Sequence, residues 1–377
     1  MLILAAVVAI FVYGMIAAML GTILPDLSSR FHLTPRQNGT IAFAQALGLM
    51  LASLAVGPLL DDFGKKVGLV LGLALIVAAL LAIPRSAGFR SVVFLLFLLG
   101  MGGGIVVTGA NALTSDVAEA HRAVALNLVN IFFGLGGLAT PFISANLFQR
   151  NWVRLCYTVA GLALITLAIN AAVHMTPPTG QGRFILADAG PVLARPMLFI
   201  LGFLLFLYIG CEVGVWNWLV RHLIAQGIPE SRALNILSLG FALGLLLGRL
   251  GASSLLIRIP PVYVTLAASV AMTVTTFLML RTNKPGAAAA LVFLAGLSMA
   301  PVFPTTLAIV ADAFPRMTST AIGIVITCGW AGLAVSSHVI GAIAGPDPKR
   351  IRKALLVIPA SSVLMIALNL AILAMAH

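Results

Sequence analysis

Long apolar stretches alternate with short polar connections along most of the 377-residue chain. Each stretch has about 20 residues, which is the length that an α-helix needs to cross a hydrocarbon core about 30 Å thick. Prolines, glycines and charged residues mark the breaks between the stretches. The pattern predicts twelve membrane-spanning helices, at residues 2–24, 37–60, 67–84, 91–113, 123–147, 155–174, 196–220, 233–256, 262–280, 287–310, 319–344 and 354–376.

The longest predicted connection lies between the sixth and seventh spans. It divides the chain into an N-terminal six-helix bundle at 1–174, a linker at 175–195 and a C-terminal six-helix bundle at 196–377. Two pairs of similar short segments support an internal duplication. The glycines of GPLLDDFGKK and GLLLGRLGAS coincide at an offset of 187, and FGLGGLATP resembles CGWAGLAVS at an offset of 195. The predicted fold class is therefore an all-α membrane protein of two pseudo-symmetric bundles.

Composition supports a membrane protein and narrows its partners. Hydrophobic residues make up 61% of the chain and charged residues 8%, against about 25% charged residues in soluble domains. The formal net charge is +12, but most basic residues stand singly or in pairs in short connections, which indicates contact with lipid headgroups and not with nucleic acid. The three cysteines lie in apolar stretches at unrelated spacings, so neither a disulfide framework nor a metal site is predicted.

The stretch GPLLDDFGKK carries a recognisable signature. It resembles the motif that joins the second and third helices of the major facilitator superfamily, and the matching positions are Gly57, Asp61, Gly64, Lys65 and Lys66. Asp62 departs from the motif, because a basic residue is usual there. In that family the motif controls conformational change, and Arg249 of GLLLGRLGAS is assigned to the corresponding place in the second half.

Three further stretches resemble the fucose, galactose and glucose symporter branch of that family: residues 108–141, 208–219 and 297–309. The resemblance implies a monomeric transporter that imports monosaccharides with protons or sodium ions. Its two halves would rock about a site near the bilayer midplane. It also implies a multi-pass protein of the bacterial inner membrane with both termini in the cytoplasm.

The distribution of basic residues opposes that orientation. With both termini inside, the inner connections hold eight of the 22 lysines and arginines, and the outer connections hold fourteen. Basic residues normally favour the cytoplasmic side. We retain the orientation because the signature motif lies on the cytoplasmic side throughout the family.

Glu212 is the one acidic residue predicted well inside a span; the other nine acids lie at or near connections. Intramembrane acids are costly and are usually functional. Tyr208, Glu212 and Trp216 are spaced i, i+4, i+8, so they share one helix face. A carboxylate accepts hydrogen bonds from sugar hydroxyls, and aromatic rings stack on sugar rings. The alternative is that Glu212 only joins neighbouring helices through a hydrogen bond.

The coupling ion stays open at this point. The fucose symporter of the resembled branch has essential acids on helices one and four, where this chain has Gly21 and Val107. Proton coupling would therefore use Glu212 or His338, and sodium coupling or uniport are alternatives. His338 has a competing interpretation as a packing residue. No cofactor other than such an ion is predicted.

Uncharged polar residues supply the rest of the candidate substrate site. Amides offer both donors and acceptors to a neutral polyol, although they also join helices in static bundles. The candidates are Gln45, Asn111, Asn127, Asn130 and Asn217, with Trp330 as a weaker aromatic candidate. Pro301 and Pro304 are expected to bend the tenth span.

Two other function classes compete with sugar transport. An enzyme is disfavoured because the chain has no G-x-S-x-G, H-E-x-x-H or Walker-type motif. An exporter of amphipathic compounds or lipids is the main alternative within transport, and it would need a more apolar cavity.

Overall fold

The computed structural model describes residues 1–149, 151–175, 190–282, 284–345 and 350–376. Within these ranges twelve helical segments are long and apolar enough to cross a membrane, one at each predicted span, and no strand is present. The all-α fold class is therefore confirmed. Most of the predicted linker at 175–195 lies outside the described residues.

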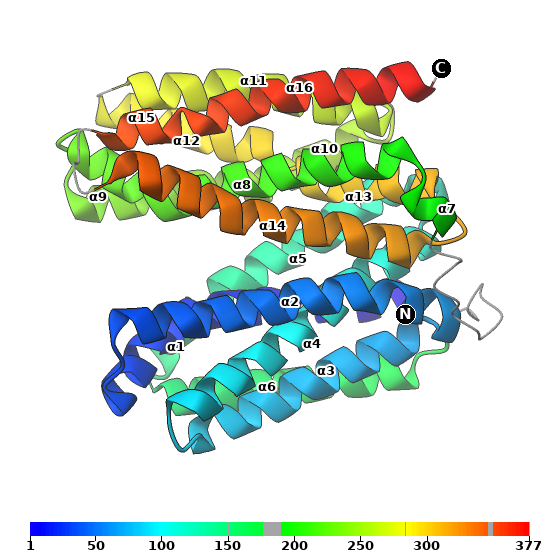
Figure 1. Cartoon of the computed structure of the whole chain (residues 1–377), viewed down its shortest axis with the longest axis vertical. Coiled ribbons are helices and arrows are strands. Elements are labelled where there is room, and N and C mark those ends of the chain that lie inside the picture. The colour runs from blue at the N-terminus through cyan, green and yellow to red at the C-terminus, as the bar shows by residue number, and fades with distance from the viewer. Residues whose placement is uncertain (150, 176–189, 283, 346–349, 377) are drawn as a thin grey trace. The chain divides into compact units, whose positions relative to one another are not determined.

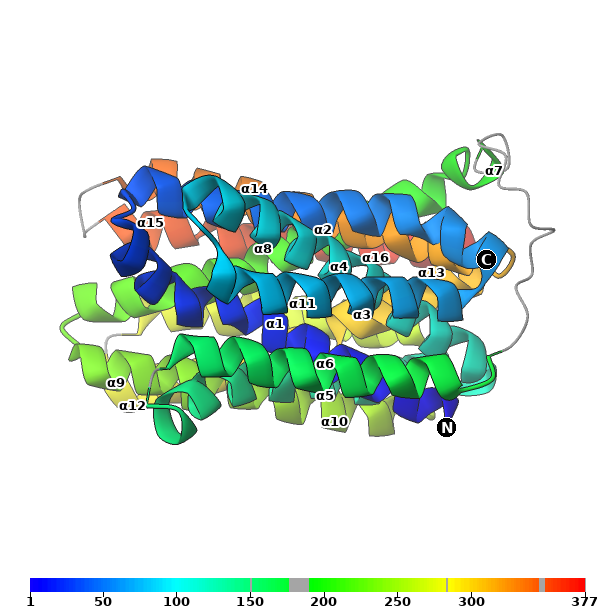
Figure 2. The same cartoon turned by 90° about the horizontal axis from the view of Figure 1, so that it is seen from below.

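The described residues form two compact units. Unit 1 comprises residues 1–120, 129–194 and 314–327. Within it, α2 packs against α4, and α3 packs against both α4 and α6 (Figure 1; Figure 2). Its helices are α1 Leu2–Phe31, α2 Pro35–Phe63, α3 Lys65–Ala82, α4 Phe89–Val117, most of α5 Arg122–Phe142, α6 Trp152–Ala172 and the short α7 Gly190–Leu193.

Unit 2 comprises residues 121–128, 195–313 and 328–377. Within it, α11 packs against α16 and α12, and α10 packs against α12. Its helices are α8 Pro196–Ala225, α9 Glu230–Asn235, α10 Leu243–Leu255, α11 Pro261–Arg281, α12 Pro285–Met299, α13 Val302–Ala313, most of α14 Thr318–Ala344, α15 Ile351–Leu355 and α16 Val357–Ala376.

Two helices are shared between the units. The first turns of α14, up to Thr327, belong to unit 1, and the first turns of α5, up to Leu128, belong to unit 2. A division at the predicted linker alone would place each of these helices in one unit. The first turns of α14 and of α5 make polar contacts that are described in the next subsection.

Glycine contacts repeat in the two units with one constant offset. In unit 1, a Cβ on Gly48 would meet Phe97 O at 2.2 Å, and one on Gly136 would meet Phe11 O at 2.1 Å. In unit 2, the corresponding values are 2.3 Å from Gly244 to Phe293 O and 2.0 Å from Gly332 to Phe206 O. Each glycine of unit 2 lies 196 positions after its counterpart. These helices approach closely because the glycine has no side chain to hold it away from the backbone of its partner helix.

This packing corrects the predicted register of the repeat. The counterpart of Gly244 is Gly48, so the glycine frame at an offset of 187 is wrong, although the similarity at 195 is only one residue from the observed offset. Gly244 and Arg249 lie within α10 and not in a connection. The coincidence at 187 arose because small residues recur on many packed helix faces.

Several spans differ in detail from uniform helices, among them the second, eighth and tenth. The signature stretch is helical up to Phe63 and again from Lys65, so the predicted connection is reduced to Gly64. The tenth span is interrupted between Met299 and Val302, where the prolines were expected to bend it. The eighth span contains a π-helix, Ile236–Ala242, which the sequence pattern did not indicate.

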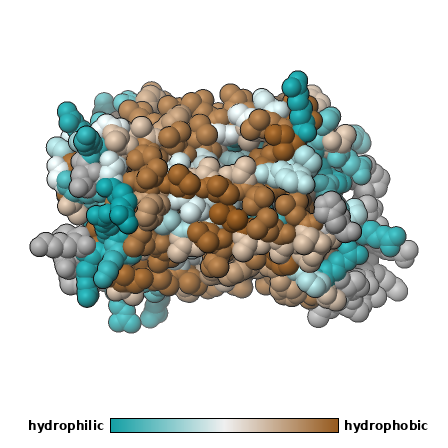
Figure 3. Space-filling view, turned by 90° about the horizontal axis from the view of Figure 1, so that it is seen from above, coloured by the Kyte–Doolittle hydropathy of each residue, from teal (hydrophilic) through white to brown (hydrophobic). Residues whose placement is uncertain are grey.

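Apolar side chains cover the outer faces of the long helices. Exposed large hydrophobic residues occur on nearly every span, among them Phe43, Phe94, Phe199 and Leu239. Figure 3 shows hydrophobic side chains over the middle of the face in view and hydrophilic ones mainly toward its left and right edges. Such faces are compatible with lipid and not with water.

Candidate functional site

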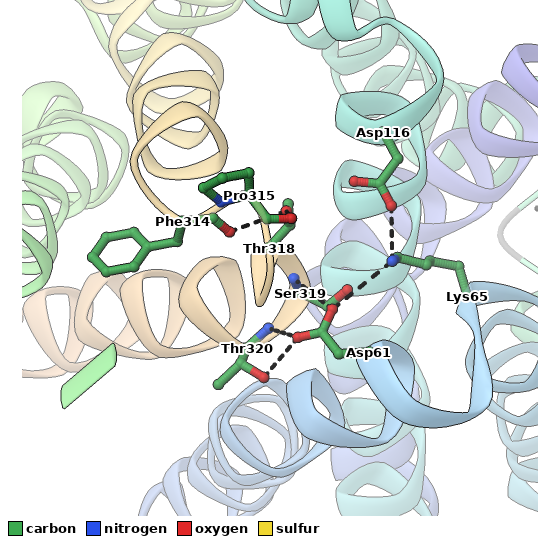
Figure 4. A network of polar contacts seen from close by, with 8 residues as sticks. All are labelled: Asp61, Lys65, Asp116, Phe314, Pro315, Thr318, Ser319 and Thr320. Carbon is green, nitrogen blue, oxygen red and sulfur yellow. Dashed lines mark hydrogen bonds and ion pairs between the residues drawn. The ribbon is translucent and has the colours of Figure 1, made fainter. Parts of the chain in front are cut away.

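Asp61, at the end of α2, caps the first turn of α14 within unit 1. Its carboxylate accepts hydrogen bonds from Ser319 N at 3.1 Å, Thr320 N at 2.8 Å and Thr320 Oγ1 at 2.8 Å (Figure 4). The first backbone N–H groups of a helix have no partner in the helix, and its N-terminus favours negative charge. Asp61 therefore supplies from α2 the cap that α14 lacks in its own sequence.

Lys65 joins this cap to a third helix. Its Nζ lies 2.7 Å from Asp116 Oδ2 at the end of α4 and 3.8 Å from Asp61 Oδ1 (Figure 4). Lys65 is 8% exposed, so its charge is largely removed from water and depends on these carboxylates. The neighbouring Lys66 is half-buried and is not part of this network.

Two glycines of the signature are required by backbone geometry. Gly64 has φ +89°, a region that favours glycine, and this residue alone turns the chain from α2 into α3. A Cβ at Gly57 would lie 2.5 Å from Thr320 Cα. Glycine at this position therefore allows α2 to come close enough for Asp61 to reach α14.

Asp62 has no comparable role. It is half-buried, and its Oδ2 has no hydrogen-bond partner within the described part of the chain. The departure from the family signature does not disturb the Asp61 cap, because the two side chains leave the helix in different directions.

Three of the predicted amides lie buried in unit 1, and two of them are paired. Asn130 Nδ2 on α5 donates to Asn111 Oδ1 on α4 at 2.8 Å, and Asn111 Nδ2 donates to Val107 O at 2.7 Å. Gln45 on α2 is 8% exposed and donates to Ile16 O at 3.5 Å. Its Oε1 has no partner within the described residues.

The predicted stripe on α8 runs from a buried to an exposed position in unit 2. Tyr208 is fully buried, Glu212 is half-buried, and Trp216 is 37% exposed with its ring edge-on to Phe241 at 5.3 Å. Glu212 on α8 and Arg249 on α10 are both charged neighbours of the Tyr208 hydroxyl. Asn217, next to Trp216, is exposed.

Arg249 is buried in the middle of α10. It is 5% exposed and lies six residues before the end of α10, at the position that corresponds to Ser53 in the repeat. The structure brings this guanidinium into the electrostatic neighbourhood of Tyr208, the same tyrosine that Glu212 influences.

The start of α5 is held to α13 within unit 2. Asn127 Nδ2 donates to Thr305 Oγ1 at 3.0 Å and to Ala123 O at 2.8 Å, and Arg122 forms an ion pair with Asp312. Asn127 Oδ1 and the neighbouring Thr306 Oγ1 are buried without a partner in the described residues.

The two histidines inside spans have opposite settings. His338, the predicted one, is exposed on α14, and its Nδ1 lies 3.0 Å from Ala334 O in the preceding turn. His222 on α8 is 1% exposed, and its Nε2 lies 3.0 Å from Gln226 Nε2. Sequence reasoning passed over His222 because it stands near the predicted end of the seventh span.

Several predicted substrate residues have unpaired buried polar atoms, a property that cannot be read from the sequence. Each has a buried polar side-chain atom with no hydrogen-bond partner in the described ranges: Gln45 Oε1, Asn127 Oδ1, Tyr208 Oη and Trp330 Nε1. Thr108 and Thr306, which sequence reasoning missed, have the same property. An unpaired buried polar group costs about 1–3 kcal/mol, so a set of such groups indicates positions prepared for a ligand or water.

Comparison with known proteins gives a consistent family. The sequence model described as Major Facilitator Superfamily matches residues 6–337. The Saccharomyces cerevisiae protein named Bypass of stop codon protein 6 is 24% identical over 66% of this chain and 55% of its own length. A Brucella abortus protein named Glucose/galactose transporter is 28% identical over 60% of each chain. The chain thus spans little more than half the length of these relatives.

Solved structures share the fold. The E. coli fucose:proton symporter FucP superposes with a TM-score of 0.83 at 16% identity, and the alignment covers 97% of each chain. At this identity the likeness concerns the fold alone.

Proposed function

The chain belongs to the Major Facilitator Superfamily, and from this premise we propose that it carries a neutral monosaccharide across a bacterial inner membrane by alternating access. Both termini face the cytoplasm in this proposal, and the two six-helix halves move as the carrying elements. Relatives named as glucose/galactose and glucose/mannose transporters support the substrate class.

The main support for this proposal is that several buried polar atoms have no hydrogen-bond partner within the described residues. Gln45, Asn127, Tyr208 and Trp330 offer donors and acceptors without charge. Sugar hydroxyls donate and accept at once, so they can satisfy these groups within either unit, whereas an apolar export substrate would leave the same groups unpaired. This difference favours a sugar over an amphipathic compound.

We assign proton coupling to Glu212. Its carboxyl is half-buried on α8 beside the buried Tyr208, and ionisable groups inside membrane spans commonly belong to proton pathways. His338 is a poorer candidate because its exposed ring contacts the backbone of its own helix.

Sugar accumulation in proteoliposomes tests the function and the coupling together. One proton per sugar supports about tenfold accumulation for each unit of imposed pH gradient, because one pH unit corresponds to 1.36 kcal/mol. Wild-type protein should reach this accumulation with glucose or galactose. Glu212→Gln should exchange labelled sugar but should not accumulate it.

Glu230→Gln is the matched control, since Glu230 is an exposed acid of the same unit at the start of α9. It should accumulate sugar as the wild type does. Accumulation driven by a sodium gradient and not by a proton gradient would contradict the assignment of Glu212. Absence of any sugar exchange by wild-type protein would contradict the transport proposal.

Replacing Gln45 by leucine tests the substrate site in unit 1. We expect the KM for sugar to rise about tenfold, because the variant loses one hydrogen bond to the sugar. The melting temperature should change little, because the hydrogen bond from Gln45 to Ile16 O is long. Asn369→Leu on α16 is the comparison, since Asn369 is a buried amide whose Oδ1 accepts from Thr265 Oγ1 and whose Nδ2 donates to Ser269 Oγ and Met365 O. That variant should lower stability and leave KM unchanged, and the reverse pattern would contradict the site.

A further inference from the structure

A groove of about 670 Å³ opens on unit 1 where α3 ends and α4 begins. Its walls are mainly apolar and come from the last turns of α3 and the first turns of α4. The connecting turn contributes its polar residues. The lining residues are Ala78, Leu81, Ala82, Arg85, Ser86, Ala87, Ser91, Phe94 and Leu95, and no acidic residue is among them.

Arg85 is the charged group of the groove. It is exposed, its Nη1 donates to Leu81 O at 2.6 Å, and its guanidinium stacks over the ring of Tyr157 at 5.4 Å. These contacts hold the side chain in place while using one of five N–H donors. The remaining donors are suited to a phosphate, which arginine binds through two parallel hydrogen bonds.

Ser86, next to Arg85, is an independent sign of a ligand. It is 6% exposed, and its hydroxyl is buried without a hydrogen-bond partner in the described ranges. Ser86 is one of the residues that line the groove, and its hydroxyl lies just below the groove surface, so it donates to a ligand only once the side chain turns toward the groove. Phosphate and ester oxygens accept such a hydrogen bond.

Aromatic contacts place the polar turn at the depth of lipid headgroups. Arg30 donates to Pro84 O at 2.9 Å and stacks over Trp152 at 5.6 Å, beside the Arg85–Tyr157 pair. Tryptophan and tyrosine are enriched at the membrane–water interface. The walls that run from this turn along α3 and α4 therefore lie at the depth of acyl chains.

The charge of the connections on the side of Arg85 favours an anionic headgroup. Within the described residues of unit 1, the connections on the side of Arg85 hold one acid, Asp26, against five arginines: Arg30, Arg36, Arg85, Arg90 and Arg154. A basic surface at the headgroup level attracts anionic lipids. Attraction of anionic lipids also gives a reason for the excess of basic residues in the outer connections, which is the reverse of the usual orientation rule.

We propose that the groove binds one anionic phospholipid, whose phosphate contacts Arg85 and Ser86 and whose acyl chain lies along the α3 and α4 walls. The site is separate from the polar residues assigned to transport. A free phosphate would meet Arg85 but would make no use of the apolar walls.

Native mass spectrometry of the detergent-purified full chain tests this site. The protein is mixed with equal amounts of phosphatidylglycerol and phosphatidylcholine that have the same acyl chains. The first lipid bound to wild-type protein should be phosphatidylglycerol about five times as often as phosphatidylcholine, the effect expected of one basic contact. Arg85→Gln should bring this ratio close to one. Ala78→Phe, which keeps every charge and fills an exposed wall, should lower binding of both lipids.

Arg281→Gln is the matched control, because Arg281 is also exposed, ends a helix on the same side and stacks over Phe277 at 4.9 Å. It should keep the wild-type ratio, and the melting temperature of every variant is recorded to exclude unfolding. A wild-type ratio of one would overturn the proposal. The proposal would also be overturned if Arg281→Gln reduced the preference for phosphatidylglycerol as much as Arg85→Gln does. Release of the bound lipid on addition of inorganic phosphate would overturn it as well.

Discussion

Asp61→Ala should reduce sugar exchange at least tenfold. The carboxylate accepts three hydrogen bonds from Ser319 and Thr320, and each charge-assisted bond contributes about 1.5–3 kcal/mol. Removing it leaves two N–H groups of the α14 terminus without their partner and Lys65 with Asp116 as its remaining counter-ion. The packing of α14 in unit 1 should therefore lose about 3–5 kcal/mol, and a transport cycle needs this conformation as one of its stable states.

Thiol labelling measures this packing directly. Ser319 is fully buried, so the thiol introduced by Ser319→Cys, in a background without the three native cysteines, should react slowly with a water-soluble maleimide. Adding Asp61→Ala should raise the labelling rate at least tenfold, and Asp61→Asn, which keeps an acceptor oxygen, should have a smaller effect. Asp62→Asn is the control and should behave as wild type. Unchanged exchange and labelling in Asp61→Ala would show that the cap contributes nothing.

Gly136→Ala should lower the stability of the protein by about 3 kcal/mol or more, which is at the upper end for a single substitution. The added methyl would lie 2.1 Å from Phe11 O, closer than carbon and oxygen can approach, so α1 and α5 would have to separate. The repeat predicts the same result for Gly332→Ala, where the methyl would lie 2.0 Å from Phe206 O. Melting temperatures in detergent measure both.

Gly161→Ala should act in the opposite direction. Gly161 also lies inside a spanning helix, α6, but a Cβ there would meet nothing within 4 Å. Alanine is favoured over glycine in a helix by about 0.5–1 kcal/mol, so this variant should be slightly more stable than wild type. Equal melting temperatures for Gly136→Ala and Gly161→Ala would contradict the close contact of α1 and α5.

The candidate site was predicted in part. Asn111 and Asn130 were chosen separately as amides and are joined by a hydrogen bond, and Tyr208 and Glu212 were placed together by their helical spacing. The unpaired threonines Thr108 and Thr306 were missed, and Arg249 was assigned to the conformational motif and not to the surroundings of Tyr208. Threonine is common inside membrane helices, where its hydroxyl usually bonds the carbonyl four residues earlier, as Thr114 does. The absence of that bond is visible only in the structure.

The partner of Asp61 shows why such pairings escape sequence reasoning. The motif around Asp61 and Gly64 is local, because a turn that needs positive φ requires glycine whatever lies around it. Its hydrogen-bond partners lie 258 and 259 residues further along the chain, in a helix start with no unusual sequence of its own. No spacing rule connects two such positions.

Hydropathy alone was sufficient to predict the twelve spans, because every backbone group in a bilayer must be paired within its own helix and the helix must match the thickness of the hydrocarbon. It could not predict which faces of these helices meet. Lipid tails are as apolar as leucine side chains, so burial gives little preference for one apolar face over another. Close contacts at glycines such as Gly48 and Gly136, repeated at an offset of 196, select the faces, and these contacts exist only in the folded chain.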